Sequence, residues 1–169
     1  ITLEPPEMFT AAVVNLYTVE FYELAYEALE DDGLIVQWIA AGEMWDEEIQ
    51  RLVRAMAEVF PDTTLWNAYN SFPGLLLYIG SKKPLSIDVE AMAKRMQHPA
   101  LADDLKAIGM ETPAKLLSLF IANDETIRRW TEGVPPVTDD HTVVDYAGAK
   151  SVLSGYGLGT ARLQGDERM

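Results

Sequence analysis

Residues 32–40 read DGLIVQWIA, a glycine turn followed by a short and almost continuously apolar run. This pattern is typical of a central strand in a parallel sheet that is covered on both faces. An amphipathic helix is predicted after Asp46, and Pro61 ends it. Its apolar stripe comprises Ile49, Leu52, Val53, Met56, Val59 and Phe60. A buried strand that leads directly into such a helix predicts an α/β fold.

Upstream of this strand, the chain opens with ITLEPP at residues 1–6. We interpret these residues as the end of a strand, because Pro5 and Pro6 lack backbone donors and force the chain out of a ladder. A helix is expected from Thr18, whose side chain can cap it. We expect Gly33 to supply the left-handed residue that ends this helix. The predicted order so far is strand, helix, strand and helix.

Downstream, residues 63–66 and 75–80 are two apolar segments separated by turn-forming residues, which indicates an antiparallel return. The order predicts the second half of a doubly wound, Rossmann-like sheet with an antiparallel edge strand, over residues 1–85. Residues 86–133 form a small helical appendage, with helices expected around 89–96, 101–108, 116–121 and 124–130. We expect residues 134–150 to form a return segment that carries the TDD motif, and residues 151–169 to form a flexible tail.

The composition excludes several classes of function. The chain has 13 basic and 27 acidic residues and a net charge of -14, which disfavours nucleic-acid binding. It has no cysteine, so disulfides, thiol catalysis and cysteine-ligated zinc are excluded. No apolar run approaches the roughly 20 residues of a membrane-spanning helix. We expect a cytoplasmic protein. A membrane segment upstream of Ile1 in the full-length protein is compatible with this sequence.

Four segments, taken in order, resemble the bacterial spermidine-synthase-like family, a branch of the S-adenosylmethionine-dependent methyltransferase superfold. The first is EPP at 4–6 followed by AAVVNLYTVEFY at 11–22, and the second is DGLIVQW at 32–38. The third is VFP at 59–61 before the strand at Trp66, and the fourth is TDD at 138–140 with DY at 145–146. The match reaches from Ile1 to Tyr146.

This resemblance implies transfer of an aminopropyl group from decarboxylated S-adenosylmethionine to a diamine such as putrescine. A methyltransferase of the same fold that uses S-adenosylmethionine, and a non-catalytic folding or dimerisation module, remain alternatives. Family members often carry glycine where Ala12 stands and proline where Thr142 stands. Aminopropyltransferases usually show Asp-Ser-Ser-Asp-Pro at the first loop, whereas residues 1–5 keep only the second acid, Glu4. The missing first acid is the one expected to deprotonate or orient the attacking amine.

The candidate site residues follow from this resemblance and from position. Glu4 is the candidate catalytic carboxylate, because ligands bind at the carboxyl ends of strands in open sheets; a loop cap or a solvated acid is the alternative. Gln37, which ends an otherwise apolar strand, is either a ligand for the amine or a polar residue at the sheet rim. The remaining candidates are Tyr69, Thr138, Asp139 and Asp140 for substrate and Pro5 for cofactor.

The acids at 139 and 140 have a second interpretation, as a structural turn that caps the last element. A hard metal ion at these acids is the less favoured option beside a polyamine nitrogen, and no metal is assigned. A zinc site is not expected, because His98 and His141 are the two histidines and neither has a metal-ligand spacing. We interpret His98, which precedes Pro99, as a helix-end residue. The expected partners are a polyamine or another small cation and the upstream half of the same protein, with a homodimer as a further option.

The glycine-rich stretch at 152–159, VLSGYGLG, imitates a nucleotide-binding loop. Only two apolar residues, Val152 and Leu153, precede the small residues of this stretch, which is too few for the buried strand that must deliver such a loop. Ten residues follow Gly159, which is too few for the helix and the acid that must come after it. We therefore expect the cofactor loop to lie upstream of Ile1, in a longer protein of which this chain is a fragment. The fragment alone is expected not to bind nucleotide.

Overall fold

The computed structural model describes residues 1–6, 10, 12–68 and 74–144. The strands among them are β1 (Thr2–Leu3), β2 (Leu34–Ala40), β3 (Asp62–Asn67), β4 (Leu75–Ser81) and β5 (Phe120–Ala122). The α-helices are α1 (Val19–Ala28), α2 (Asp46–Val59), α3 (Val89–Met96), α4 (Pro99–Ala107), α5 (Pro113–Leu117) and α6 (Asp124–Trp130). Two short 3-10 helices are η1 (Val13–Tyr17) and η2 (Ala41–Glu43). The predicted tail at 151–169, with its glycine-rich stretch, lies outside the described residues.

The described strands form one sheet in the order β1-β2-β4-β3-β5. β1 is parallel to β2, and β4 is antiparallel to both β2 and β3. The predicted α/β arrangement is therefore present, but the antiparallel return strand β4 lies inside the sheet rather than at its edge. The antiparallel strand at the edge is β5, which pairs with β3.

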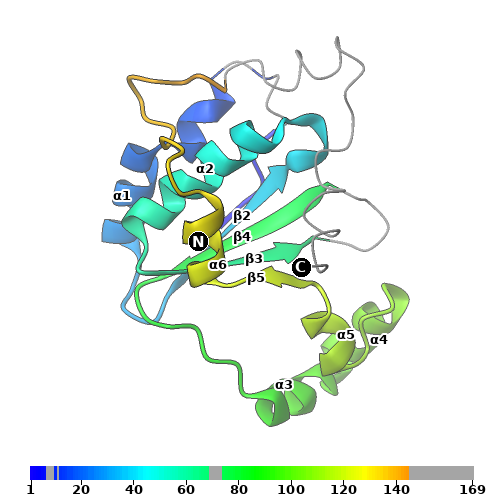
Figure 1. Ribbon diagram of the computed structural model, residues 1–169. Helices are drawn as coiled ribbons and strands as arrows, with labels where there is room; N and C mark the ends of the chain where they lie inside the picture. The colour runs from blue at the N-terminus through cyan, green and yellow to red at the C-terminus, as the bar shows by residue number, and fades with distance from the viewer. Residues whose placement is uncertain (7–9, 11, 69–73, 145–169) are drawn as a thin grey trace.

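Helices α1, α2 and α6 cover one face of the sheet, whereas α3, α4 and α5 gather beyond β5 (Figure 1). The apolar stripe of α2 packs into this layer, where Ile49, Leu52 and Met56 are fully buried and Val59 is partly buried. Gly80 of β4 lets the helix approach closely, because a Cβ atom there would lie 2.8 Å from Phe60 Cγ. The helix predicted after Asp46 and the strand predicted at 34–40 are both confirmed.

Two local predictions are wrong. Gly33 does not adopt the left-handed conformation, and α1 already ends at Ala28. Glycine fits at position 33 for a steric reason instead, since a Cβ atom there would lie 2.8 Å from Leu29 Cγ. Phe120 and Ile121, expected in a helix, belong to strand β5, because pairing with the edge of β3 supplies their backbone hydrogen bonds.

Arg128 attaches α6 to the main body of the protein. Its guanidinium donates to the carbonyl oxygens of Ala57 at 2.8 Å and Phe60 at 3.0 Å, and so caps the carboxyl end of α2. Asp124 accepts from the same side chain at 2.7 Å and raises the pKa of Arg128. Because β5 and α6 both join the main body, two parts of the 86–133 segment are built into the α/β layers.

Three buried tyrosines line the core between the sheet and the helices. The Tyr17 hydroxyl donates to the Trp38 carbonyl at 2.8 Å, and the Tyr78 hydroxyl donates to the Val53 carbonyl at 2.9 Å. The Tyr22 hydroxyl has no hydrogen-bond partner among the described residues. Burial raises the pKa of all three hydroxyls above the ordinary value of 10.0, so each is held neutral.

Tyr78→Phe and Tyr22→Phe form a matched pair that separates a bonded hydroxyl from an unbonded one. Tyr78→Phe should lower the free energy of unfolding by about 1 kcal/mol, because it removes a buried hydrogen bond. Tyr22→Phe should leave this free energy unchanged or raise it, because the hydroxyl that it removes is desolvated without compensation. Urea unfolding of both variants checks this. Equal losses would mean that Tyr22 has a partner in the folded protein.

Candidate functional site

Glu4 lies at the carboxyl end of β1, directly after the last residue that pairs with β2. The side chain is exposed, and the following Pro5 is buried. The two prolines end the ladder here because neither can donate a backbone hydrogen bond. The prediction that residues 1–6 contain the end of a strand is therefore confirmed, and the candidate carboxylate is accessible to a ligand.

Gln37 is placed differently from the prediction. It lies inside β2 rather than at its end, opposite Leu3 of β1 and Tyr78 of β4. Its side chain is 0% exposed, and Nε2 donates to the Leu16 carbonyl at 2.8 Å. Gln37 Oε1 has no hydrogen-bond partner among the described residues. The amide therefore attaches η1 to the central strand and is not at the sheet rim.

The segment η1 carries a strained residue at its start. Ala12 has φ 65°, in the left-handed region that costs a residue with a Cβ atom about 1 kcal/mol. Members of the spermidine-synthase-like family, which the sequence resembles, often carry glycine at this position. Glycine adopts this conformation without a steric penalty, which gives a physical reason for that preference.

The turn at Thr138, Asp139 and Asp140 docks on the start of α1. The Val19 amide donates to the Val137 carbonyl at 3.0 Å, and the Asp139 amide donates to Glu20 Oε2 at 3.0 Å. Thr138 and His141 form a bridge that closes the turn. The carboxylates of Asp139 and Asp140 are exposed, so they remain available to a cation.

The described contacts connect three of the predicted segments through η1 and the start of α1. Gln37 holds η1 by Leu16, and Val19 then holds the segment that follows α6, which runs back beside α1 and α2 (Figure 1). No described contact joins Glu4 directly to Asp139 or Asp140. Tyr69, the remaining substrate candidate, lies outside the described residues.

The described residues do not form a nucleotide cradle. Strand β1 leads into Glu4 and Pro5, and β2 leads directly into η2, so neither delivers a glycine-rich loop to a following helix. No group of three metal-binding side chains occurs in the described part of the chain. His98 caps α4 by accepting from the Ala100 amide, as expected for a helix-end residue.

Similar curated proteins agree with the resemblance found in the sequence. No family model matches the chain. A polyamine aminopropyltransferase from Desulforudis audaxviator is 38% identical over 73 residues, which are 41% of this chain and 26% of that protein. One from Thermoanaerobacter sp. is 31% identical over 86 residues, 48% of this chain and 31% of that protein. The matched region thus spans about a quarter to a third of these relatives.

A solved structure agrees with the fold. The probable spermidine synthase from Corynebacterium glutamicum matches with a TM-score of 0.51 and 19% identity, over 82% of this chain and 47% of that one. The resemblance to the spermidine-synthase-like family and the α/β fold that it implies are confirmed. In the described residues, no helix is both long and apolar enough to cross a membrane.

Glu20→Ala tests whether the acidic turn depends on α1. The substitution removes the acceptor of the Asp139 amide, so hydrogen exchange at that amide should accelerate at least tenfold while the free energy of unfolding changes by less than about 1 kcal/mol. NMR-detected amide exchange measures both. Glu23→Ala, an exposed residue of the same helix, is the control. Unchanged exchange at Asp139 would contradict the docking.

Proposed function

We propose that this chain is the amine-binding part of a spermidine-synthase-like aminopropyltransferase, which transfers an aminopropyl group from decarboxylated S-adenosylmethionine to a diamine such as putrescine. The observation that carries the proposal is the exposed carboxylate of Glu4 at the carboxyl end of β1, beside β2. Ligands of open α/β sheets bind at this end of the strands. The names of the curated relatives support the same class of reaction.

The chemistry requires a carboxylate near the amine. A diamine is cationic at neutral pH, and its attacking nitrogen must lose a proton before its lone pair is available. Glu4 is positioned to hold the cation and accept this proton. The exposed Asp139 and Asp140 and the net charge of -14 favour the approach of a polyamine. Gln37 contributes indirectly by positioning η1.

The first acid of the family's loop is absent from residues 1–5, so Glu4 would have to act alone in this proposal. Its place is taken by Ile1, whose backbone nitrogen donates to the Leu34 carbonyl at 2.8 Å. Ile1 therefore lies at the opposite end of β1 from Glu4 and supplies no carboxylate. This departure favours the alternative of a methyltransferase-like protein, or of a relative that has lost aminopropyl transfer.

We place the loop that binds the adenosine part of the donor outside these 169 residues, in an upstream half of the same protein. Two observations support this placement. The described residues contain no glycine-rich loop after a parallel strand, and β1 pairs only with β2 among them. Pro5, which directly follows Glu4, is the residue of this chain that we propose to contact the donor. The edge of β1, which pairs with nothing else in the described part of the chain, equally suits a non-catalytic folding or dimerisation module.

Isothermal titration distinguishes these alternatives. The complete protein should bind decarboxylated S-adenosylmethionine and putrescine, whereas binding of S-adenosylmethionine alone would indicate a methyltransferase. The absence of heat with all three would favour the non-catalytic module. The 169-residue chain by itself should bind no nucleotide, since its described residues form no nucleotide cradle. Micromolar binding by this chain would contradict the placement of the loop.

Glu4→Gln tests the role of the carboxylate in the complete protein. The amide cannot accept the proton, so kcat for aminopropyl transfer should fall about 100-fold at neutral pH. Raising the pH should partly restore the rate, because more of the amine is then neutral without a base. Glu23→Gln, an exposed acid of α1, is the control and should keep full activity. An unchanged rate in Glu4→Gln would remove Glu4 from the mechanism.

A further inference from the structure

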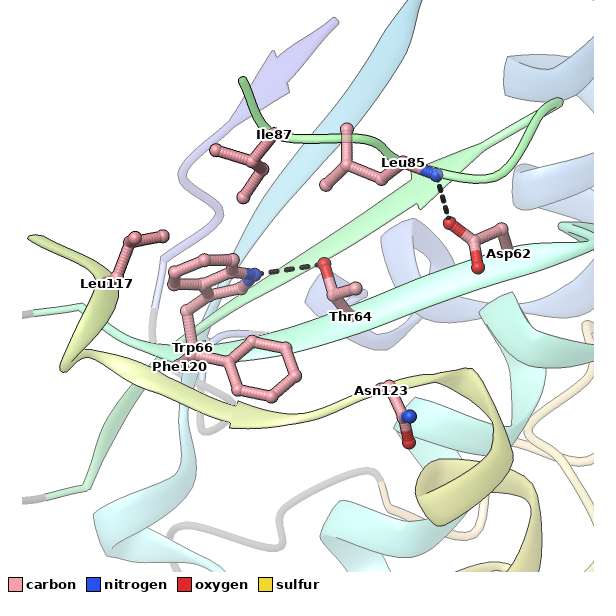
Figure 2. Close-up of a pocket in the computed structure, with 8 residues that line it drawn as sticks. All are labelled: Asp62, Thr64, Trp66, Leu85, Ile87, Leu117, Phe120 and Asn123. Atoms are coloured by element: carbon pink, nitrogen blue, oxygen red, sulfur yellow. Dashed lines mark hydrogen bonds between the residues drawn. The ribbon is translucent and has the colours of Figure 1, made fainter. Parts of the chain in front are cut away.

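A groove runs along β3 on the face of the sheet that points away from α2 and α6 (Figure 2). Its floor consists of Asp62, Thr64 and Trp66, which share one face because side chains alternate along a strand. The walls and one end are formed by Leu85, Ile87, Leu117, Phe120 and Asn123. The cavity volume of about 390 Å³ falls in the range of small-molecule sites.

One end of the groove is polar and acidic. Asp62 Oδ2 accepts from the Leu85 amide at 2.7 Å, as Figure 2 shows, and from the Ser81 hydroxyl at 3.5 Å. Asp62 Oδ1 has no hydrogen bond among the described residues. Thr64 Oγ1 accepts from Trp66 Nε1 at 2.9 Å. The fixed carboxylate therefore presents one unused oxygen, and no Lys or Arg lines the groove beside it.

The other end of the groove is aromatic and apolar. The rings of Trp66 and Phe120 meet edge to face with centroids 5.1 Å apart. Phe120 is 44% exposed and Ile87 is 39% exposed, so apolar surface remains open to a ligand. Asp62 and Trp66 are four residues apart on one strand, which separates the two ends by about 13 Å. The groove thus suits a long, narrow molecule with one cationic end.

We propose that this groove binds a linear primary alkylammonium ion, with the ammonium at Asp62 and the alkyl chain over Trp66 and Phe120. The carboxylate supplies a charge-assisted hydrogen bond, which is stronger than a bond between neutral groups. The aromatic rings supply apolar contact area along the chain. This site is separate from Glu4. The proposal can therefore be tested independently of the proposed function.

The test uses the indole signals of the chain as an internal control. In a ¹H–¹⁵N correlation spectrum of the 169-residue protein, hexylammonium should shift the Trp66 indole signal and leave those of Trp38, Trp45 and Trp130 in place. Trp66→Phe assigns the signal. Hexanol should bind about tenfold more weakly than hexylammonium, and hexanoate should not bind, because Asp62 favours a cation.

Asp62→Asn removes the charge and retains an oxygen that can accept from the Leu85 amide. It should weaken hexylammonium binding about tenfold and leave hexanol binding unchanged, whereas the control Glu90→Gln on α3 should change neither. Equal affinities of the unsubstituted protein for hexylammonium and hexanol would show an apolar groove without selectivity for cations and would overturn the proposal. Shifts of all four indole signals would also overturn it. So would the absence of any shift at the highest hexylammonium concentration at which the protein stays folded.

Discussion

The hydrogen bond from the Gln37 amide to the Leu16 carbonyl is the interaction that fixes η1 and, through it, the start of α1. Gln37 is fully buried in the central strand, where an amide without a partner would cost several kcal/mol. The bond therefore fixes η1 against β2. Because η1 leads directly into Thr18, which caps α1, the same contact sets where α1 begins and where its acidic first turn lies.

The later part of the chain is fixed in turn by the start of α1. Val19 and Glu20 hold the segment around Val137 and Asp139, which is more than 100 residues away in sequence. The central strand and the segment after α6 are therefore connected through η1 and the first turn of α1. The turn that carries Asp139 and Asp140 is attached to α1, whereas Glu4 is placed separately by the pairing of β1 with β2. Gln37, which the sequence offered as a ligand for the amine or a residue at the sheet rim, is buried inside β2 and positions η1.

The elements that sequence reasoning placed well are those with strong local patterns. Strand β2 and helix α2 show a continuous apolar run and a clear amphipathic stripe, and both have the predicted character. Phe120 and Ile121 were misplaced because a short apolar run fits a helix or a strand equally well, and only pairing with β3, over 50 residues away, decides it. The burial of Gln37 is also a tertiary property. The groove on β3 escaped prediction because its residues come from three distant segments.

The two prolines after β1 explain how a strand of this sheet presents the candidate acid. Pro5 and Pro6 cannot donate backbone hydrogen bonds, and the pairing of β1 with β2 ends at Leu3. Glu4 is the first residue beyond the last pair, and its side chain is exposed. The same prolines that end the pairing therefore keep the carboxylate of Glu4 out of the ladder, at the end of the strand where ligands of open α/β sheets bind.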